Sequence, residues 1–257
     1  MYGDLVSIIM PAYNCEAFIG ESIKSVINQT YKNFELLIAD DCSSDNTADV
    51  VLEFVKDNNN IKYFKLETNL GAALARNYII KKARGTYLAF LDSVDIWLPE
   101  KLEKQIRFME DNHYFFTCTN YGKIDEYSKS KNICITCLGK YDYDAILKDC
   151  PGNSTIIYNA KVLGKFYGVD IKRRNDFVMW LKVIKKAEFA YGLNILLSYH
   201  RERAGSISIN KRELIKYQWI VYRDIEHLSL YKCYLLMIYK IIHTLKLRCG
   251  FRNCNVK

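Results

Sequence analysis

The residues best suited to chemistry are two carboxylates in the segment Asp92-Ser93-Val94-Asp95, directly after an apolar run. The run Tyr87–Leu91 has the composition of a buried strand, and carboxylates at the end of such a strand are costly unless they are paired, solvated or bound to a cation. Carboxylate oxygens bind divalent metals such as Mg²⁺ or Mn²⁺, and the metal can bind a diphosphate. Val94 is apolar at a position where a third carboxylate would fit, so metal binding and catalysis depend partly on this residue.

Polar segments follow three of the predicted strands. They are Pro11–Asn14, Asp40–Asp45 and Asp92–Asp95. The carboxyl ends of parallel strands meet at one edge of a sheet, which is where α/β proteins bind ligands. Asp45 alone is explained by capping of the following helix, but three such segments in register favour a binding edge. The chain contains no GxGxxG after its first strand and no Walker A motif, which argues against a dinucleotide-binding Rossmann domain and a P-loop NTPase.

Alternating strands and helices over the first 112 residues must position these segments. The predicted strands are 6–10, 34–39, 61–66 and 87–91, and the predicted helices are 16–29, a second ending near 57, 71–83 and a fourth beginning at Pro99. Such a series predicts an α/β fold with a Rossmann-like, mostly parallel central sheet, right-handed crossovers and flanking helices.

The second half of the chain has a mixed pattern. Further strands are predicted at 114–121, 133–138, 155–158 and 193–199, with a helix at 176–187 that places Phe177, Trp180, Leu181 and Ile184 on one face. We expect residues 1–210 to form one body, with a nucleotide-binding half at 1–112 and an acceptor or catalytic half at 113–210. Residues 211–257 are predicted to form a basic, helical C-terminal extension.

Charge is concentrated in that extension. The chain carries a formal +8, of which +7 lies in residues 211–257 and only +1 in residues 1–210.

No signal peptide is evident at the N-terminus, and no run is long and apolar enough to span a membrane. The nine cysteines, including the single pair Cys134 and Cys137, are expected to be reduced and not to bind zinc. No nucleic-acid-binding module is present, so a nucleic-acid partner is not expected.

Taken together, five segments resemble the inverting glycosyltransferases of family 2, which have the GT-A nucleotide-sugar-binding fold. The segments are VSIIMPAYNCEAFIGESIKSVINQTYKNFELLIADDCSSDNT, GAALARN, KARGTYLAFLDSVDIW, NDFVMWLKV and YHRERAGSIS. The resemblance covers about residues 5–210 and is specific as a set, although each motif alone would be weak.

The resemblance implies a site for a UDP-sugar. The residues that it places there are Pro11, Ala12, Tyr13, Asn14, Asp40, Asp41, Arg76, Asp92 and Ser93. In this interpretation Asp41 accepts a hydrogen bond from the uracil imide, Asp40 shapes the loop, and Arg76 meets the nucleotide or its diphosphate as a fixed cation. A surface position on a helix is the alternative for Arg76.

Asp176 is the candidate catalytic base, because it follows Asn175 where the family usually has an acidic pair. An inverting transfer needs one carboxylate to take the proton of the acceptor hydroxyl. Helix capping would also explain an aspartate there, but not the match over Asp176–Leu181. His200, Arg201 and Arg203 belong to the last matching segment, and they either contact the diphosphate or are ordinary loop residues.

Val94 departs from the family pattern Asp-Ser-Asp-Asp, because valine cannot ligate a metal. Three explanations remain open. Asp92 and Asp95, with His200, hold Mn²⁺ or Mg²⁺ weakly; basic residues replace the metal; or the chain is an impaired variant.

The predicted helix 230–247 is amphipathic, with Lys232, Lys240, His243 and Lys246 on one side. This helix either contacts an anionic membrane or packs on the rest of the protein, residues 1–210. We therefore expect an enzyme at the cytoplasmic face of the plasma membrane that transfers a hexose from a UDP-sugar to a saccharide linked to undecaprenyl diphosphate. The product would be an O-antigen or another bacterial surface polysaccharide. The alternative is a non-catalytic nucleotide-sugar-binding or scaffold protein.

Overall fold

A central β-sheet organises the part of the chain that the structure, a computed structural model, describes: residues 3–203 and 211–248. Four parallel strands form one half, in the order β3 (Ile61–Lys65), β2 (Phe34–Asp40), β1 (Val6–Ala12) and β4 (Tyr87–Phe90). The order continues through β9 (Ile157–Asn159), β6 (Phe116–Ile124), β10 (Ala190–Arg201) and β5 (Ile96–Trp97). Two short strands complete the sheet, β7 (Ser130–Ile135) beside β6 and β8 (Lys140–Tyr141) beside β10.

Strands β6 and β10 pair in parallel, and β9 runs antiparallel between β4 and β6. The α/β prediction of a mostly parallel central sheet with flanking helices is therefore confirmed. The predicted strand at 193–199 begins earlier and extends further, because β10 pairs with β6 from Thr117 to Ile124 and passes a register shift near Leu196.

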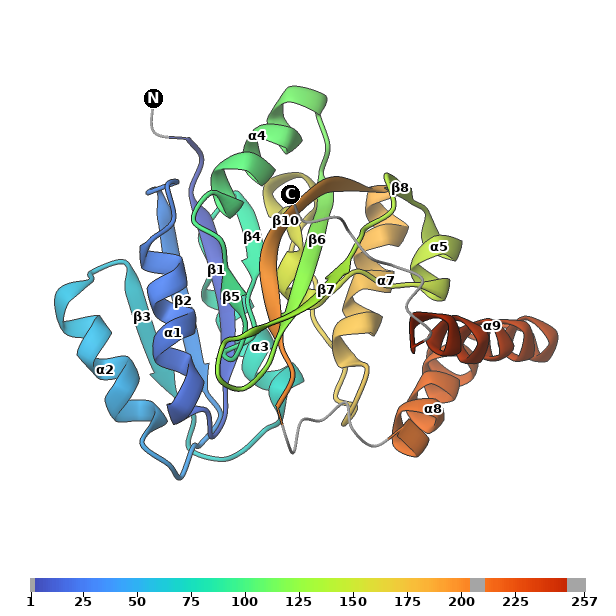
Figure 1. Ribbon diagram of the computed structural model, residues 1–257, viewed down its shortest axis with the longest axis horizontal. Helices are drawn as coiled ribbons and strands as arrows, with labels where there is room; N and C mark the ends of the chain where they lie inside the picture. Colours follow the sequence, from blue (N-terminus) through green and yellow to red (C-terminus); the bar gives the residue numbers. More distant parts are fainter. Residues whose placement is uncertain (1–2, 204–210, 249–257) are drawn as a thin grey trace.

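Helices cover both faces of the sheet (Figure 1). One face carries α1 (Glu16–Ile27), α2 (Thr47–Asp57) and α4 (Lys101–Asn112), and the other carries α3 (Ala72–Lys82) and α7 (Asn175–Ala187). Alternate residues of β1 show the division: Ile8 packs with the first group and Ile9 with the second. Side chains alternate across a strand, so a strand covered on both faces is apolar throughout, as the fully buried β2 is.

The remaining helices lie on the α7 side of the sheet, and α8 and α9 lie together beyond α7 (Figure 1). They are α5 (Tyr143–Lys148), α6 (Ala160–Leu163), α8 (Lys211–Ile220) and α9 (Leu230–Arg248), with a 3-10 turn η1 (Asn153–Thr155) and a π-helical turn η2 (Val221–Ile225).

The C-terminal helices pack into the body. Tyr222, Cys233 and Leu236 are buried in the same core cluster as α3 and α7. The division of the chain at residue 211 stays a prediction, but α8 and α9 share this core. No helix within residues 3–203 and 211–248 has both the length and the apolar character needed to cross a membrane.

Helix α9 faces the body with its cations. Lys232 pairs with Asp144 of α5 at 2.7 Å, and the Lys240 ammonium lies 5.6 Å from the centre of the Phe177 ring. The opposite side exposes apolar side chains, including Tyr231, Leu235 and Ile238. The predicted amphipathic pattern is therefore real, but Lys240 is directed toward the body and Lys232, 41% exposed, pairs with α5 at the surface. The side chains of His243 and Lys246 lie outside the described residues.

Candidate functional site

The Asp92–Asp95 turn lies at the carboxyl end of β4, and η1 supports it. Asn153 Nδ2 donates to Asp92 Oδ1 at 2.8 Å, and the Asp92 amide donates to Ser154 Oγ at 3.1 Å. Ser154 Oγ donates in turn to Asp95 Oδ2 at 2.6 Å. Nothing in the sequence pattern singled out Asn153 or Ser154, because a polar pair before a strand is common in loops.

Asp95 is fully buried and binds the end of β10. His200 Nδ1 lies 3.2 Å from Asp95 Oδ2, and the Arg201 amide donates to Asp95 Oδ1 at 3.0 Å. The Asp95 carboxylate raises the pKa of His200 to about 9. Burial alone would raise the pKa of Asp95, but the His200 charge and these hydrogen bonds hold it below its usual value.

Asp92 has a different environment, with a side chain that is 35% exposed and Arg76 Nη2 at 3.6 Å. Burial, and then the negative charge of Asp95, raise the pKa of Asp92 above its usual range.

The expected metal ligands Asp92, Asp95 and His200 do not form a three-ligand cluster. Both Asp95 oxygens already accept hydrogen bonds or pair with His200, so Asp95 orients His200 and does not face a ligand. Within the described parts of the chain, no three His, Cys, Asp or Glu side chains are grouped to hold a metal. Val94 packs against the core on the α1 side. The protein groups still available to a metal are the Asp92 carboxylate and Nε2 of His200. Two groups are too few for a divalent cation, so oxygens of a bound substrate would have to complete its coordination.

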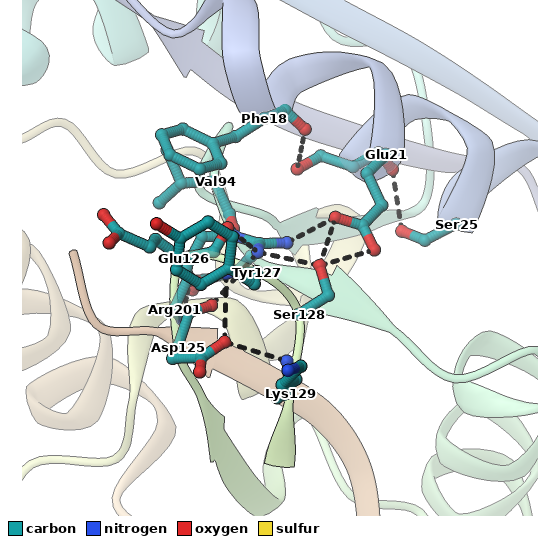
Figure 2. Close-up of polar contacts among 12 residues, drawn as sticks. Phe18, Glu21, Ser25, Val94, Asp125, Glu126, Tyr127, Ser128, Lys129 and Arg201 are labelled. Carbon is teal, nitrogen blue, oxygen red and sulfur yellow. Dashed lines mark hydrogen bonds and ion pairs between the residues drawn. The ribbon is translucent and has the colours of Figure 1, made fainter. Parts of the chain in front are cut away.

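Arg201 is a structural residue (Figure 2). Its side chain is fully buried, and its guanidinium binds Glu21 of α1 at 2.5 Å and Ser128 Oγ at 2.9 Å. It also donates to the carbonyls of Val94, Asp125 and Glu126. The interpretation of Arg201 as a diphosphate contact is thereby corrected, because its donors are engaged within the protein. Arg203 stacks its guanidinium over Phe18 at 5.5 Å, and the rest of its motif, residues 204–208, lies outside the described residues.

The loops after β1 and β2 are joined to each other. The Asn14 amide donates to Ser43 Oγ at 3.0 Å, and the Ser44 amide donates to Asn14 Oδ1 at 2.9 Å. Pro11 and Ala12 end β1, with Ala12 buried, whereas the Tyr13 ring is 49% exposed at the sheet edge. Ser93, 8% exposed, lies in the neighbouring turn and receives a hydrogen bond from Ser22 on its carbonyl.

Asp40 and Asp41 are both buried. Asp40 accepts hydrogen bonds from the Ser43 amide at 2.9 Å and from the Tyr63 hydroxyl at 2.6 Å, in agreement with a loop-shaping role. Asp41 accepts one bond on each oxygen, from the amides of Leu70 and Gly71 at 2.7 and 2.8 Å. Gly71 precedes α3 with a φ of 85°, a conformation that glycine adopts without strain. A carboxylate oxygen has a second acceptor position, so the predicted contact of Asp41 with uracil stays a prediction.

Arg76 joins the turn after β4 to the start of α7. It is 5% exposed, its Nη1 donates to Asn175 Oδ1 at 3.0 Å, and its Nη2 lies near Asp92. Its buried Nε has no hydrogen-bond partner among the described residues. The alternative of a surface position for Arg76 is therefore excluded, since the side chain lies inside the sheet edge.

Asp176 lies in the first turn of α7 and is partly buried. No described residue donates a hydrogen bond to its carboxylate, and its charge contributes to the raised pKa of Asp92. Arg174 is the capping residue, so Asp176 is not the helix cap. The arrangement therefore brings an available carboxylate close to the strand-edge loops, as expected for a base that serves a ligand bound there.

Solved structures share this fold. TarS of S. aureus, residues 1–349 in complex with UDP, superposes with a TM-score of 0.70 at 21% identity, covering 92% of this chain and 70% of that one. The mannosyltransferase PcManGT from Pyrobaculum calidifontis, in complex with GDP-Man and Mn²⁺, gives a TM-score of 0.56 at 16% identity, covering 85% and 61%. The fold is therefore that of the GT-A glycosyltransferases.

The chain belongs to glycosyl transferase family 2, whose profile matches residues 7–163. It is 39% identical over 251 residues to the Escherichia coli protein named UDP-Glc:alpha-D-GlcNAc-diphosphoundecaprenol beta-1,3-glucosyltransferase WfgD, with 97% of both chains covered. It is 38% identical over 229 residues to the putative teichuronic acid biosynthesis glycosyltransferase TuaG of Bacillus subtilis, covering 89% of this chain and 91% of the relative. The protein is a glycosyltransferase, which confirms the interpretation of the five sequence motifs.

Proposed function

We propose that this protein transfers a hexose, glucose as the first choice, from a UDP-sugar to a saccharide linked to undecaprenyl diphosphate, during synthesis of a bacterial surface polysaccharide such as an O-antigen. The observation that carries the proposal is the available carboxylate of Asp176, which the Asn175–Arg76–Asp92 contacts connect to the nucleotide side of the sheet edge. The full-length similarity to relatives named for this acceptor supports the choice of substrates.

The reaction proceeds with inversion in a single displacement. Asp176 accepts the proton of the acceptor hydroxyl as that oxygen attacks the anomeric carbon, and the bond from this carbon to the UDP oxygen breaks. Negative charge then develops on the departing diphosphate. Arg76, with an unpartnered buried Nε, and His200, held protonated by Asp95, are the fixed cations that stabilise it.

A divalent cation, Mn²⁺ or Mg²⁺, fits this site as a shared ligand of the protein and the donor. Asp92 would hold it together with the neutral form of His200, whose ring Asp95 would orient through Nδ1; His200 would then be a ligand and no longer a fixed positive charge. When bound, such a cation supplies positive charge to the diphosphate. Arg76 positions the phosphates in either case, and the His200 side chain, 46% exposed above the buried Asp95, remains accessible to the donor.

We propose in addition that α9 rests on the inner face of the plasma membrane through its apolar side. Leu235 and Ile238 are 49% and 54% exposed at helical spacing, on the side opposite to Lys240. The lipid-linked acceptor and the basic composition of residues 211–257 favour an anionic bilayer as the occupant. Deleting the extension would also remove core residues such as Tyr222, so point variants are the appropriate test.

The membrane test compares Leu235→Asp combined with Ile238→Asp against Leu52→Asp, a control on α2 where Leu52 is 42% exposed. Sedimentation with phosphatidylglycerol vesicles should show binding of the wild type and the control, and loss of binding in the α9 variant. Equal binding of all three would exclude α9 as the contact.

The test of function is transfer of labelled sugar from a panel of UDP-sugars to N-acetylglucosaminyl diphosphate lipid, with Mn²⁺, with Mg²⁺ and with chelator. Transfer by the wild type and its loss in Asp176→Asn would support the proposal. The alternative, a non-catalytic nucleotide-sugar-binding protein, predicts that UDP binds while no donor gives transfer under any metal condition.

A further inference from the structure

Tyr121, near the end of β6, lies on the same face of the sheet as His200. Strands β6 and β10 are parallel, and Lys123 is the register partner of His200. Register partners point to one face of a sheet, and residues two apart on a strand share a face, so Tyr121 points to the face of His200. The two rings meet edge to face, with their centres 6.1 Å apart and their planes at 68°. Tyr121 therefore contacts a residue that the proposed function assigns to the donor diphosphate.

The Tyr121 ring also packs against the loop that precedes η1. A Cβ placed on Gly152 would lie 3.2 Å from the ring, which is closer than an ordinary van der Waals contact. Glycine at position 152 thus allows the loop to approach the ring. The next residue, Asn153, donates to Asp92, so this loop connects Tyr121 with the turn after β4.

The hydroxyl group of Tyr121 is available to a ligand. Within residues 3–203 and 211–248, no hydrogen bond joins it to another group, and the residue is partly exposed. Tyrosine hydroxyls in largely buried positions usually have a hydrogen-bond partner. Burial, and then the charges of Asp149 and Asp95, raise the pKa of Tyr121. The hydroxyl is therefore protonated at neutral pH and can donate a hydrogen bond.

The candidate base Asp176 lies close to the same loop. Burial, and then the charge of Asp176, raise the pKa of Cys150, which comes two residues before Gly152. The Asp176 charge also acts on Asp92, after burial and the charge of Asp95. Tyr121 is thus flanked by His200 on one side and by the loop beside Asp176 on the other.

The hexose of the donor must occupy the space between these two sides. In a single displacement with inversion, the attacking oxygen and the departing oxygen lie on opposite sides of the anomeric carbon. The base therefore acts on one side of the hexose, and the diphosphate leaves on the other. A tyrosine at this position can cover C–H groups of a sugar with its ring and bind a sugar hydroxyl with its own hydroxyl.

We propose that Tyr121 contacts the transferred hexose of the UDP-sugar and contributes to the choice of that sugar. Its ring packs against C–H groups of the hexose, and its hydroxyl donates a hydrogen bond to a sugar hydroxyl. The inference rests on the proposed function and adds a contact with the donor hexose to it.

The test compares the binding of UDP with that of UDP-sugars by calorimetry, at one Mn²⁺ concentration and without an acceptor. The wild type is first titrated with UDP-glucose, UDP-galactose and UDP-N-acetylglucosamine, and the sugar that it binds most tightly is used for the comparison. In Tyr121→Phe, which keeps the ring, we expect the Kd of this UDP-sugar to rise about fivefold, the scale of one hydrogen bond between neutral groups. The Kd of UDP should stay within about twofold, because UDP has no hexose.

Tyr199→Phe is the matched control. Tyr199 is the register partner of Gly122, the residue after Tyr121, so its ring lies on the opposite face of the sheet. A Cβ placed on Gly122 would lie 2.5 Å from the Tyr199 ring, which shows that this ring covers the glycine. The control should leave the Kd of UDP and of the UDP-sugar unchanged. An equal rise for UDP and the UDP-sugar in Tyr121→Phe, or no rise for either, would overturn the proposal.

Transfer assays then separate this inference from the proposed function. In Tyr121→Phe, kcat/KM for the UDP-sugar should fall about fivefold, while the KM for the acceptor stays within about twofold. Removal of the whole ring in Tyr121→Ala should reduce the preference between UDP-glucose and UDP-galactose. If the Kd values change as expected but no UDP-sugar gives transfer, the proposed function is rejected and the hexose contact stands. Transfer by the wild type, with the same UDP-sugar affinity in Tyr121→Phe, would reject the hexose contact alone.

Discussion

Arg201 Nε donates a hydrogen bond to the main-chain carbonyl of Val94 at 2.8 Å, whereas the Val94 side chain packs against the core on the α1 side. The turn that carries Asp92 and Asp95 is thus held through its backbone, and its geometry does not require a carboxylate at position 94. The departure from the family pattern changes the ligands offered at the turn and leaves the turn itself intact.

Restoring a carboxylate should therefore strengthen metal binding without altering the fold. In Val94→Asp, we expect the Mn²⁺ concentration that gives half-maximal transfer to fall by about tenfold, because hard cations bind more tightly as carboxylate ligands are added. Titration of transfer rate against Mn²⁺ measures this, and Val94→Leu is the control for packing. The same Mn²⁺ dependence in all three proteins would contradict the assignment of the cation to this turn.

Removing the base should affect turnover and not donor binding. Asp176→Asn keeps the size of the side chain but does not accept a proton, so kcat should fall by about 10²- to 10⁴-fold. Binding of UDP, measured by calorimetry, should be unchanged. Transfer at the wild-type rate would exclude Asp176 as the base.

The buried guanidinium of Arg201 should contribute to stability. Arg201→Met removes its bonds to Glu21, to Ser128 and to three carbonyls, and should lower the free energy of unfolding by about 2 kcal/mol, with the exposure of Glu21 limiting the loss. Urea unfolding measures the change. The control Arg107→Met removes an exposed pair with Asp111 and should cost no more than about 0.5 kcal/mol. Equal losses would show that burial of Arg201 is not what stabilises the turn.

Glu202 should make the protein sensitive to acid. Burial opposes its ionisation, but hydrogen bonds from Lys123 and Lys131 outweigh this and lower its pKa to about 2, compared with 4.5 in a free side chain. Because the folded pKa is depressed, the stabilising contribution is present above pH 4.5 and is lost as the pH falls toward 2. The stability difference between the wild type and Glu202→Gln, followed by urea unfolding against pH, should shrink over that range. A difference independent of pH would refute the role of Glu202.

The sheet could be predicted because its signals are local, and a local motif also pointed to Asp176, whose role as the base stays a prediction. Apolar runs bounded by polar segments located β1, β2 and β4, and the residues around Asp176 matched a motif. The support of the turn could not be predicted, because Ser154 and Asn153 reach Asp92 and Asp95 across about sixty residues of chain. Non-local contacts of this kind leave no periodic pattern.

The orientation of α9 illustrates the same limit. A helical wheel shows that Lys240 and the apolar residues lie on different sides, but not which side the body covers. Only the core, where Cys233 and Leu236 are buried, decides that the lysine side packs inward. The sequence left two alternatives open for Arg201 for a similar reason, since an arginine in a ligand-binding motif gives no sign that its donors are already used within the protein.

The bonds between Asn14 and the Ser43–Ser44 amide and hydroxyl groups have a consequence for binding of the UDP-sugar, which we propose to occur at this edge of the sheet. These bonds hold the loops after β1 and β2 together in the absence of a nucleotide. The conformational entropy of these loops is therefore lost during folding and not during donor binding. Donor affinity is then coupled to the integrity of the first two strands. Substitution of Asn14 removes the hydrogen bond to the Ser44 amide, so the two loops would have to order when the donor binds, and donor association should be slower.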